Sequence, residues 1–257
     1  MKVTSFAPCR ELAPVVRSIE IVTSCAEVER TLLPDPGLVL GLRYAGAAAL
    51  VEGGAARPLP GRSITGLRTT ARRMRTSAGG GIVVVKFHTL GAGALVDGPL
   101  HRLFGELRPL DEVVDPGALD EATARLGRAR SDEERVAVVE GFLRARCVRR
   151  PVDRLVARVV EAIEEAPGSI RIGPLAQRLG VSQDALEKRF RRVVGASPKA
   201  FASLVHVRDA VRAFPQQASL TGLAMAAGFY DQSHFNRRFR AVAGAPPGQV
   251  LGSPEVC

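Results

Sequence analysis

Apolar and polar residues follow two different patterns along the chain, and the pattern changes near Phe87. Before this point, short apolar stretches are separated by segments rich in Gly and Pro, a pattern typical of β-strands joined by turns. The stretches that predict strands are residues 19–23, 38–44, 47–52 and 81–87. From Gly91 onward the apolar pattern lengthens and predicts helices near 99–104, 116–126 and 131–147. The first part of the chain is therefore predicted to be a compact β-barrel or sandwich with helices packed on it.

The helix predicted at 131–147 closes this first part. Ser131 and Glu134 form a capping-box pattern at its start, and arginines occupy its last turn. The segment CVRRP follows, and beyond it every apolar pattern has helical spacing. We therefore predict an α+β protein with two domains. These are an N-terminal β-barrel domain at residues 1–147 and an all-α domain at residues 152–257.

The second part contains an internal repeat at an offset of 49 residues. RFRRVVGASP at 189–198 aligns with RFRAVAGAPP at 238–247, and each copy follows a short helical segment that ends at a glycine. Glycine allows the positive φ of a tight turn between two helices. A short helix, a glycine turn and a longer helix form a helix-turn-helix unit. A repeat of this kind does not arise by chance, and we predict two such units.

Each of the two longer helices is predicted to have an apolar face and a polar, mostly basic face. The predicted inner residues are Leu186, Phe190 and Val193 in the first copy and Phe235, Phe239 and Val242 in the second. The predicted outer residues are Asp184, Glu187, Lys188 and Arg191 in the first copy and Ser233, Asn236, Arg237 and Arg240 in the second. Exposed arginines contribute little to stability, so binding explains them better than folding does.

A third helical segment joins the two units. Ser197 and Pro198 are expected to begin it and Pro215 to end it. A helix of about 17 residues extends about 25 Å at 1.5 Å per residue. Such a helix can hold two recognition helices near the roughly 34 Å that separate successive turns of a DNA duplex. The pattern therefore predicts one chain that reads two successive major grooves of double-stranded DNA.

Charge and cysteine content narrow the function classes. The formal net charge of +10 favours a polyanion as partner. The apolar runs are far shorter than the roughly 20 residues of a membrane-spanning helix, and the first residues lack the apolar core of a secretory signal, so we expect a cytoplasmic, nucleoid-associated protein and no membrane partner. The four cysteines have no short spacing, which favours reduced thiols over a zinc site or disulfides. No catalytic residue, metal or cofactor is predicted.

At the level of motifs, residues 152–251 resemble the AraC/XylS family of transcriptional regulators. The second unit carries the resemblance in Gly228-Phe229, Ser233, Phe235, Arg237 to Phe239 and Gly244 to Pro247. The first unit carries it in Leu175-Ala176, Leu179-Gly180, Ser182, Leu186, Phe190, Gly195 and Pro198. The resemblance implies a domain of seven helices whose third and sixth are recognition helices, here residues 182–194 and 231–243. It also implies RNA polymerase or other transcription machinery as a partner.

Two departures from the family pattern stand out. Val250 and Leu251 occupy positions where such proteins often have a tyrosine and a basic residue, so the last helix is expected to pack or contact phosphate differently. Asp184 and Glu187 lie on the first recognition face, where a phosphate backbone repels them. A carboxylate can accept a hydrogen bond from cytosine, but we favour for Asp184 the role of complementing the helix dipole in the first turn.

Side-chain chemistry divides the exposed residues into two predicted roles. Arg and Lys pair with guanine and Asn with adenine, which makes base contacts the predicted role of Asp184, Glu187, Lys188, Ser233, His234, Asn236 and Arg237. Phosphate contacts are the predicted role of Arg191, Arg192, Lys199 and Arg240.

The first 150 residues resemble a short form of the family's cupin-like sensing domain, without a ligand signature. The resemblance implies control by a small-molecule effector or a role in homodimer formation, and a plain packing module is the other interpretation. Arg72, Arg73 and Arg75 are expected either to line the site of an acidic ligand or to form a solvated strand face, and we favour the solvated face. The rival function is an enzyme, either a cupin-type metal enzyme, for which only His88 and His101 are present here, or a DNA-repair methyl acceptor at Cys9. A nonspecific, chromatin-like DNA binder is the third interpretation.

Overall fold

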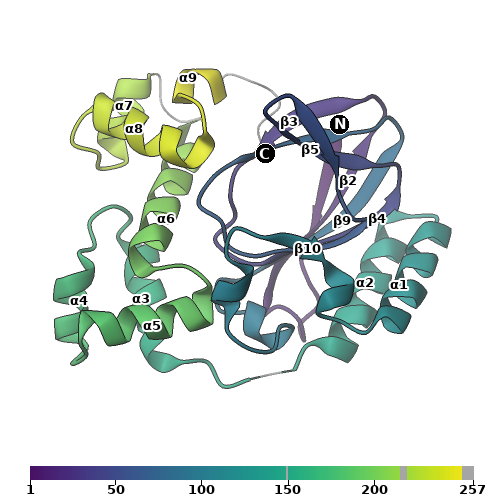
Figure 1. The fold of residues 1–257 in the computed structure, drawn as a ribbon, viewed down its shortest axis with the longest axis horizontal. Coiled ribbons are helices and arrows are strands. Elements are labelled where there is room, and N and C mark those ends of the chain that lie inside the picture. Colours follow the sequence, from purple (N-terminus) through teal and green to yellow (C-terminus); the bar gives the residue numbers. More distant parts are fainter. Residues whose placement is uncertain (149, 215–218, 251–257) are drawn as a thin grey trace.

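Residues 1–148, 150–214 and 219–250 are described by the computed structural model, and they form a β domain followed by a helical domain (Figure 1). The β domain contains two antiparallel sheets, with strand orders β1-β2-β9-β4-β7-β10 and β3-β8-β5-β6. The strands of the first sheet are β1 (Lys2–Phe6), β2 (Val16–Ser24), β9 (Gly80–Phe87), β4 (Val39–Ala45), β7 (Arg62–Thr65) and β10 (Leu107–Pro109). The strands of the second sheet are β3 (Val28–Leu32), β8 (Arg72–Thr76), β5 (Ala48–Glu52) and β6 (Ala55–Pro58). The two sheets curve around a central cavity.

Alternation along the central strand β9 separates two environments. Val83, Val85 and Phe87 are fully buried on the outer face of the sheet, in the core formed with the helices of this domain. Ile82 and Val84 point the other way and line the cavity between the sheets. The apolar run GIVVVKF therefore reflects a strand that packs on both faces.

Helices α1 (Pro116–Arg128) and α2 (Asp132–Arg146) cover the outer face of the larger sheet (Figure 1). Three short 3₁₀-helices precede them: η1 (Ala92–Ala94), η2 (Leu100–Leu103) and η3 (Leu110–Glu112). Ser131 caps α2 and accepts a hydrogen bond from the Glu134 N–H at 3.1 Å, as the capping pattern predicts. The α+β class and the order of a β domain before a helical domain are confirmed. The short strands β1, β3, β6, β7, β8 and β10 were not predicted.

The helical domain contains seven α-helices in its described part. They are α3 (Arg154–Glu165), α4 (Ile172–Arg178), α5 (Gln183–Val194), α6 (Pro198–Ala213), α7 (Leu220–Ala226), α8 (Gln232–Ala243) and α9 (Pro247–Val250). The third and the sixth of these, α5 and α8, are the helices expected to be the recognition helices. Figure 1 shows α6 between the two units, with α4 and α5 near one of its ends and α7 and α8 near the other. Pro215, Leu251 and Cys257 lie outside the described residues. No helix in the described parts of the chain is long and apolar enough to cross a membrane.

The two domains share a contact that the sequence did not reveal. Leu67, in the loop between β7 and β8, is 4 % exposed and packs in the core of the helical domain. In the same loop the Ala71 N–H donates to the carbonyl oxygen of Val242 at 2.6 Å, at the end of α8. On the other unit, η2 packs against α5, and Leu100 lies beside Gly195. The β domain therefore contacts the C-terminal end of each recognition helix.

Candidate nucleic-acid interface

The two helix-turn-helix units are built with the same local devices. Gly180 and Gly228, with φ of 71° and 76°, turn the chain after the short helices α4 and α7. Gly195 and Gly244, with φ of 98° and 75°, end the long helices α5 and α8 in the left-handed region. Only glycine adopts this region without strain, so these positions fix where each helix stops.

The N-termini of the recognition helices are capped by side chains. Ser182 accepts a hydrogen bond from the Ala185 N–H at 3.2 Å, and Asp231 accepts one from the His234 N–H at 2.6 Å. Each cap satisfies one of the free N–H groups in the first helical turn. The caps therefore fix the residues at which α5 and α8 begin.

The inner faces of α5 and α8 hold each unit together. Phe190, Phe235 and Phe239 are fully buried, and their burial contributes about 2 to 3 kcal/mol each. The rings of Phe235 and Phe239 meet edge to face with centroids 5.6 Å apart, and Phe190 lies 5.7 Å from Phe201 of α6. The predicted inner stripe is confirmed except at one position, since Val194 is 4 % exposed while Val193 is only partly buried.

The outer face of α5 carries charges of both signs that pair along the helix. Lys188 Nζ lies 2.8 Å from a carboxylate oxygen of Asp184, and Arg191 lies 4.0 Å from Glu187. The hydrogen bond that Lys188 donates to Asp184 and the negative charge of that carboxylate raise the pKa of Lys188. These pairs are solvent-exposed and add little to stability, but they reduce the positive potential that the face presents to DNA.

The outer face of α8 is different. Ser233 and Arg237 are exposed, whereas His234 and Asn236 are partly buried. The rings of His234 and Phe229 meet edge to face, with their centroids 5.6 Å apart. Among the described residues, no carboxylate lies within ion-pair distance of Arg237 or Arg240. The positive charges of Arg237 and Arg240 on this face are therefore not neutralised by carboxylates among the described residues.

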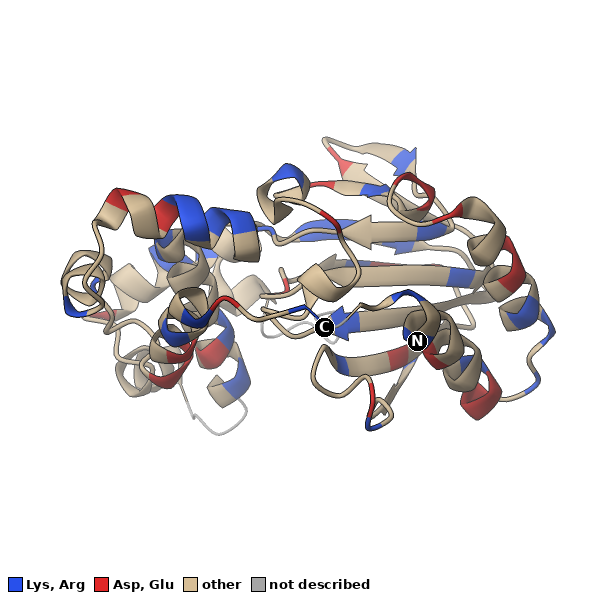
Figure 2. Ribbon diagram, turned by 90° about the horizontal axis from the view of Figure 1, so that it is seen from below, with Lys and Arg blue, Asp and Glu red and all other residues tan. Residues whose placement is uncertain are grey.

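The remaining predicted phosphate contacts are also accessible. Arg192 and Lys199 are exposed, at the end of α5 and the start of α6. Figure 2 shows basic residues along the helical domain as well as on the β domain, so positive charge alone does not single out one face. The basic residues relevant to DNA are defined by their position on α5, α6 and α8.

Two exposed apolar side chains of the second unit were missed by the sequence reasoning. Tyr230, just before α8, is 92 % exposed, and Met225 of α7 is 72 % exposed. Single exposed apolar side chains are common on protein surfaces, and these two lie in the same unit as α8. The signal for Tyr230 was available, because it lies in the turn between the motif residues Gly228-Phe229 and the cap of α8.

The rival enzyme functions depend on two further kinds of site, a metal site and a reactive cysteine. The described residues contain no group of three or more His, Cys, Asp or Glu side chains that could hold a metal ion. Cys9, Cys25 and Cys147 are free thiols, and burial raises the pKa of Cys147 to about 11. A thiol with a raised pKa is a poor nucleophile at neutral pH.

Comparison with known proteins agrees with this geometry. Residues 175–253 match the family model described as a helix-turn-helix domain, and this range contains both α5 and α8. A probable AraC family transcriptional regulator from Rhodopseudomonas palustris CGA009 is 32% identical over 38% of this chain and 95% of that chain, with a TM-score of 0.33. No curated protein sequence matches the chain.

Solved structures with a similar fold extend over both domains. ToxT from Vibrio cholerae has a TM-score of 0.51 at 10% identity and covers 98% of this chain and 98% of that chain. ToxT from Vibrio cholerae O395 bound to (E)-4-(8-methylnaphthalen-1-yl)but-3-enoic acid has a TM-score of 0.50 at 13% identity, over 91% of this chain and 96% of that chain. At these identities the likeness shows the fold alone.

The β domain, the two repeated units and their exposed polar faces define a DNA-binding transcription regulator. The chain belongs to the AraC family of helix-turn-helix regulators, and the family resemblance predicted from its motifs is confirmed.

Proposed function

We propose that one copy of this regulator reads a bipartite DNA site with α5 and α8 in two successive major grooves. The observation that carries the proposal is the matched construction of the two units, which bury equivalent phenylalanines and leave polar faces exposed at the two ends of α6. The 16 residues of α6 extend about 24 Å, and the helices packed at its ends add to this separation. The spacing suits grooves one helical turn apart.

Within this proposal the side chains take two roles. Base contacts come from the first half of each recognition helix, where Lys188 and Arg237 suit guanine and Asn236 suits adenine. Ser233, His234, Asp184 and Glu187 complete the set of base-contact candidates. Arg191, Arg192, Lys199 and Arg240 hold the phosphate backbone and set the register without reading sequence. Asp184 also forms an ion pair with Lys188, which supports an electrostatic role in the first turn as well.

The proposal extends to partners and control. The regulator acts with RNA polymerase or other transcription machinery in the cytoplasm, and one copy fills both grooves, so a homodimer is not required. A small-molecule effector binds the cavity of about 390 Å³ between the two sheets, a volume in the usual range of ligand sites. Arg208 of α6 lines this cavity and donates a hydrogen bond to the Pro34 carbonyl oxygen at 2.6 Å, which supports a link between effector and DNA-binding domain. The acid-bound ToxT structure supports the same idea by analogy.

Selection of bound duplexes from a random pool by the purified full chain tests this function. We expect two short sequence blocks separated by about one helical turn. The selected duplex should bind more than about 10³ times more tightly than random duplex at the same salt concentration. A pool without enriched sequence, or equal affinity for all duplexes, would show a nonspecific binder instead.

A further inference from the structure

The cavity of the β domain has an unusual lining for the interior of a small domain. Its wall includes six basic side chains, Arg30, Arg43, Arg68, Arg72, Lys86 and Arg208, but only two acidic ones, Glu20 and Asp35. Charged groups inside a protein are normally paired, since burial of an isolated charge is costly. The excess of cations therefore calls for a partner that the chain itself does not supply.

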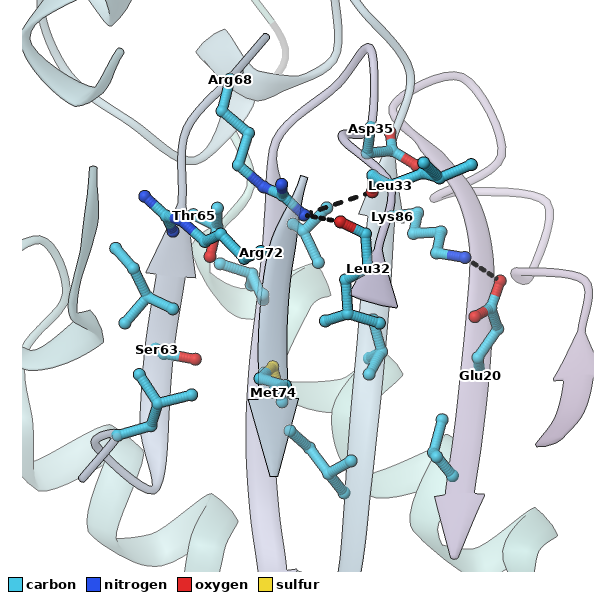
Figure 3. Close-up of a pocket in the computed structure, with 18 of the residues that line it drawn as sticks. Glu20, Leu32, Leu33, Asp35, Ser63, Thr65, Arg68, Arg72, Met74 and Lys86 are labelled. Atoms are coloured by element: carbon cyan, nitrogen blue, oxygen red, sulfur yellow. Dashed lines mark hydrogen bonds and ion pairs between the residues drawn. The ribbon is translucent and has the colours of Figure 1, made fainter. Parts of the chain in front are cut away.

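Most of these cations have protein partners, some of which Figure 3 shows. Lys86 Nζ lies 2.7 Å from Glu20, and Arg208 lies 3.8 Å from Asp35. Arg68 donates to the carbonyl oxygens of Leu32 and Leu33 at 3.0 and 3.2 Å. The cations at this end of the cavity, which faces the helical domain, therefore largely have hydrogen-bond or ion-pair partners within the chain.

Arg30 and Arg43 are different. Arg30 is only 7 % exposed, and its Nε has no hydrogen-bond partner. Arg43 has neither a partner for its Nε nor one for its Nη1, and both atoms are buried. Among the described residues, no carboxylate lies within ion-pair distance of either side chain. Burial and the nearby charge of Arg30 lower the pKa of Arg43, as expected for two cations that share a poorly solvated space.

The two arginines reach the cavity from opposite sheets. Arg30 lies on β3 and pairs in register with Met74 of β8, while Arg43 lies on β4 and pairs in register with Ile82 of β9. Met74 and Ile82 also line the cavity, together with Val22, Leu50 and Val84. Free guanidinium N–H groups thus lie beside an apolar wall. Along β4, Arg43 lies at one end of the cavity, and Val39, which pairs with Lys86, lies at the other end.

The arginines of β8 that face outward have carboxylate partners, unlike Arg30 and Arg43 in the cavity. Arg73 forms an ion pair with Glu29 on the outer surface, and Arg75 lies 3.1 Å from the same carboxylate. Arg72, between Met74 and the loop, points inward, lines the cavity and keeps a buried Nη1 without a partner. The expectation of a solvated strand face is therefore correct for Arg73 and Arg75 and wrong for Arg72.

We propose that the cavity binds an amphiphilic anion, whose single acidic group lies between Arg30 and Arg43 and whose apolar body lies against Met74, Ile82 and Val84. This inference rests on the proposed control of the regulator by a small molecule and names the chemical class of that molecule. A carboxylate fits the two guanidinium groups because it accepts several charge-assisted hydrogen bonds at once. The apolar wall adds affinity for an alkyl or aromatic body, which inorganic anions lack.

Calorimetric titration and thermal unfolding of the full chain test the proposal with octanoate, octan-1-ol and inorganic phosphate as probes. We expect octanoate to bind and to raise the Tm. Octan-1-ol lacks the charge and phosphate lacks the apolar body, so both should bind at least about tenfold more weakly. Equal binding of octan-1-ol would contradict the role of the arginines, and equal binding of phosphate would reduce the site to one for small anions. Absence of octanoate binding would also overturn the proposal.

Variants separate binding from folding. Arg43→Gln and Arg30→Gln should each weaken octanoate binding about ten- to a hundredfold, since each removes charge-assisted hydrogen bonds. Arg73→Gln, which changes an arginine on the outer surface, is the matched control and should bind octanoate like the wild type. Without ligand, Arg43→Gln should unfold at a Tm equal to or above that of the wild type, because the substitution removes an unpaired buried charge. A lower Tm would indicate a structural role and contradict the proposal.

Affinity for the selected duplex, measured on the same samples, keeps the two proposals distinct. Specific DNA binding without octanoate binding contradicts the ligand class alone. Octanoate binding by a chain that does not distinguish the selected from random duplex contradicts the proposed function and leaves the anion site standing.

Discussion

The two helix-turn-helix units share a scaffold and differ in the faces that they expose. Both bury phenylalanines at equivalent positions, Phe190 and Phe239, and both end a recognition helix at a left-handed glycine. Yet α5 pairs Lys188 and Arg191 with carboxylates of its own, while the described residues provide none within ion-pair distance of Arg237. The repeated phenylalanines and glycines are required for the packing of each unit, whereas packing does not constrain the exposed residues of α5 and α8. The difference between the faces therefore marks recognition, and we expect α8 to supply the larger share of electrostatic attraction.

The largest expected effect is on stability and comes from substitutions in the core that the two units share. Phe190→Ala and Phe239→Ala each leave a cavity at a fully buried site and should lower the free energy of unfolding by about 3 to 5 kcal/mol. Urea unfolding measures both, with Tyr230→Ala at an exposed site as control. Similar losses support equivalent scaffolds, whereas a loss below about 1 kcal/mol at either site would contradict the equivalence.

The next effect separates the two outer faces. Arg237→Ala should cost about 1 to 3 kcal/mol on the selected duplex and relax the preference at one base pair. Lys188→Ala should cost less, because Lys188 is already paired with Asp184. Titrations on the selected duplex and on its single-base variants measure both. Arg240→Ala, a phosphate candidate, should weaken all duplexes alike, and the same behaviour from Arg237→Ala would remove Arg237 from the readout set.

A smaller effect depends on pH and comes from a histidine that has no counterpart in the first copy of the repeat. His206 of α6 is 8 % exposed, stacks on Phe229 at 3.8 Å, and has Nε2 2.7 Å from the Ala227 carbonyl oxygen. Ala157 stands at the equivalent position of the first unit, 49 residues earlier. Burial lowers the pKa of His206 below its ordinary value of 6.5, so the folded state binds a proton less readily than the unfolded state.

Stability should therefore fall as the pH drops below about 6.5, by at most about 1.4 kcal/mol per pH unit from this residue. Urea unfolding of the wild type and His206→Phe at pH 7.5, 6.0 and 5.0 measures the difference. The wild type should lose more stability than the variant on acidification. Parallel pH profiles would show that His206 does not contribute.

The smallest effect makes the first face more like the second. Glu187→Gln frees Arg191 from its carboxylate, and it should raise the affinity for random duplex by a few tenths of a kcal/mol. The slope of log K against log salt should steepen by up to about 0.9. Glu133→Gln on α2 changes an exposed glutamate in the other domain and is the control. An unchanged slope for Glu187→Gln would mean that α5 does not lie near the phosphates.

The fold of the helical domain could be predicted because its determinants are local. Apolar spacing, caps and glycines repeat within a few residues, and they gave both recognition helices nearly to the residue. Short strands such as β3 and β8 were not predictable, because their pairing depends on distant partners and their sequences, VERTL and RRMRT, are polar. Hydropathy predicts that such residues are exposed.

The same limit explains what was missed in the sites. Arg30 and Arg43 are charged and nonetheless lie in a cavity, which no local pattern indicates. Leu67 packs in the core of the other domain, a contact that only the tertiary structure reveals. The pairing of Asp184 with Lys188, in contrast, follows from their spacing of four residues along a helix.

The central claim is that α5 and α8 bind together in two grooves on one side of the duplex. Insertion of five base pairs between the two selected blocks rotates one groove by about half a turn relative to the other. The measurement is the Kd of the full chain for this duplex. We predict that the affinity falls to that of random duplex, and unchanged affinity would contradict simultaneous binding by the two helices.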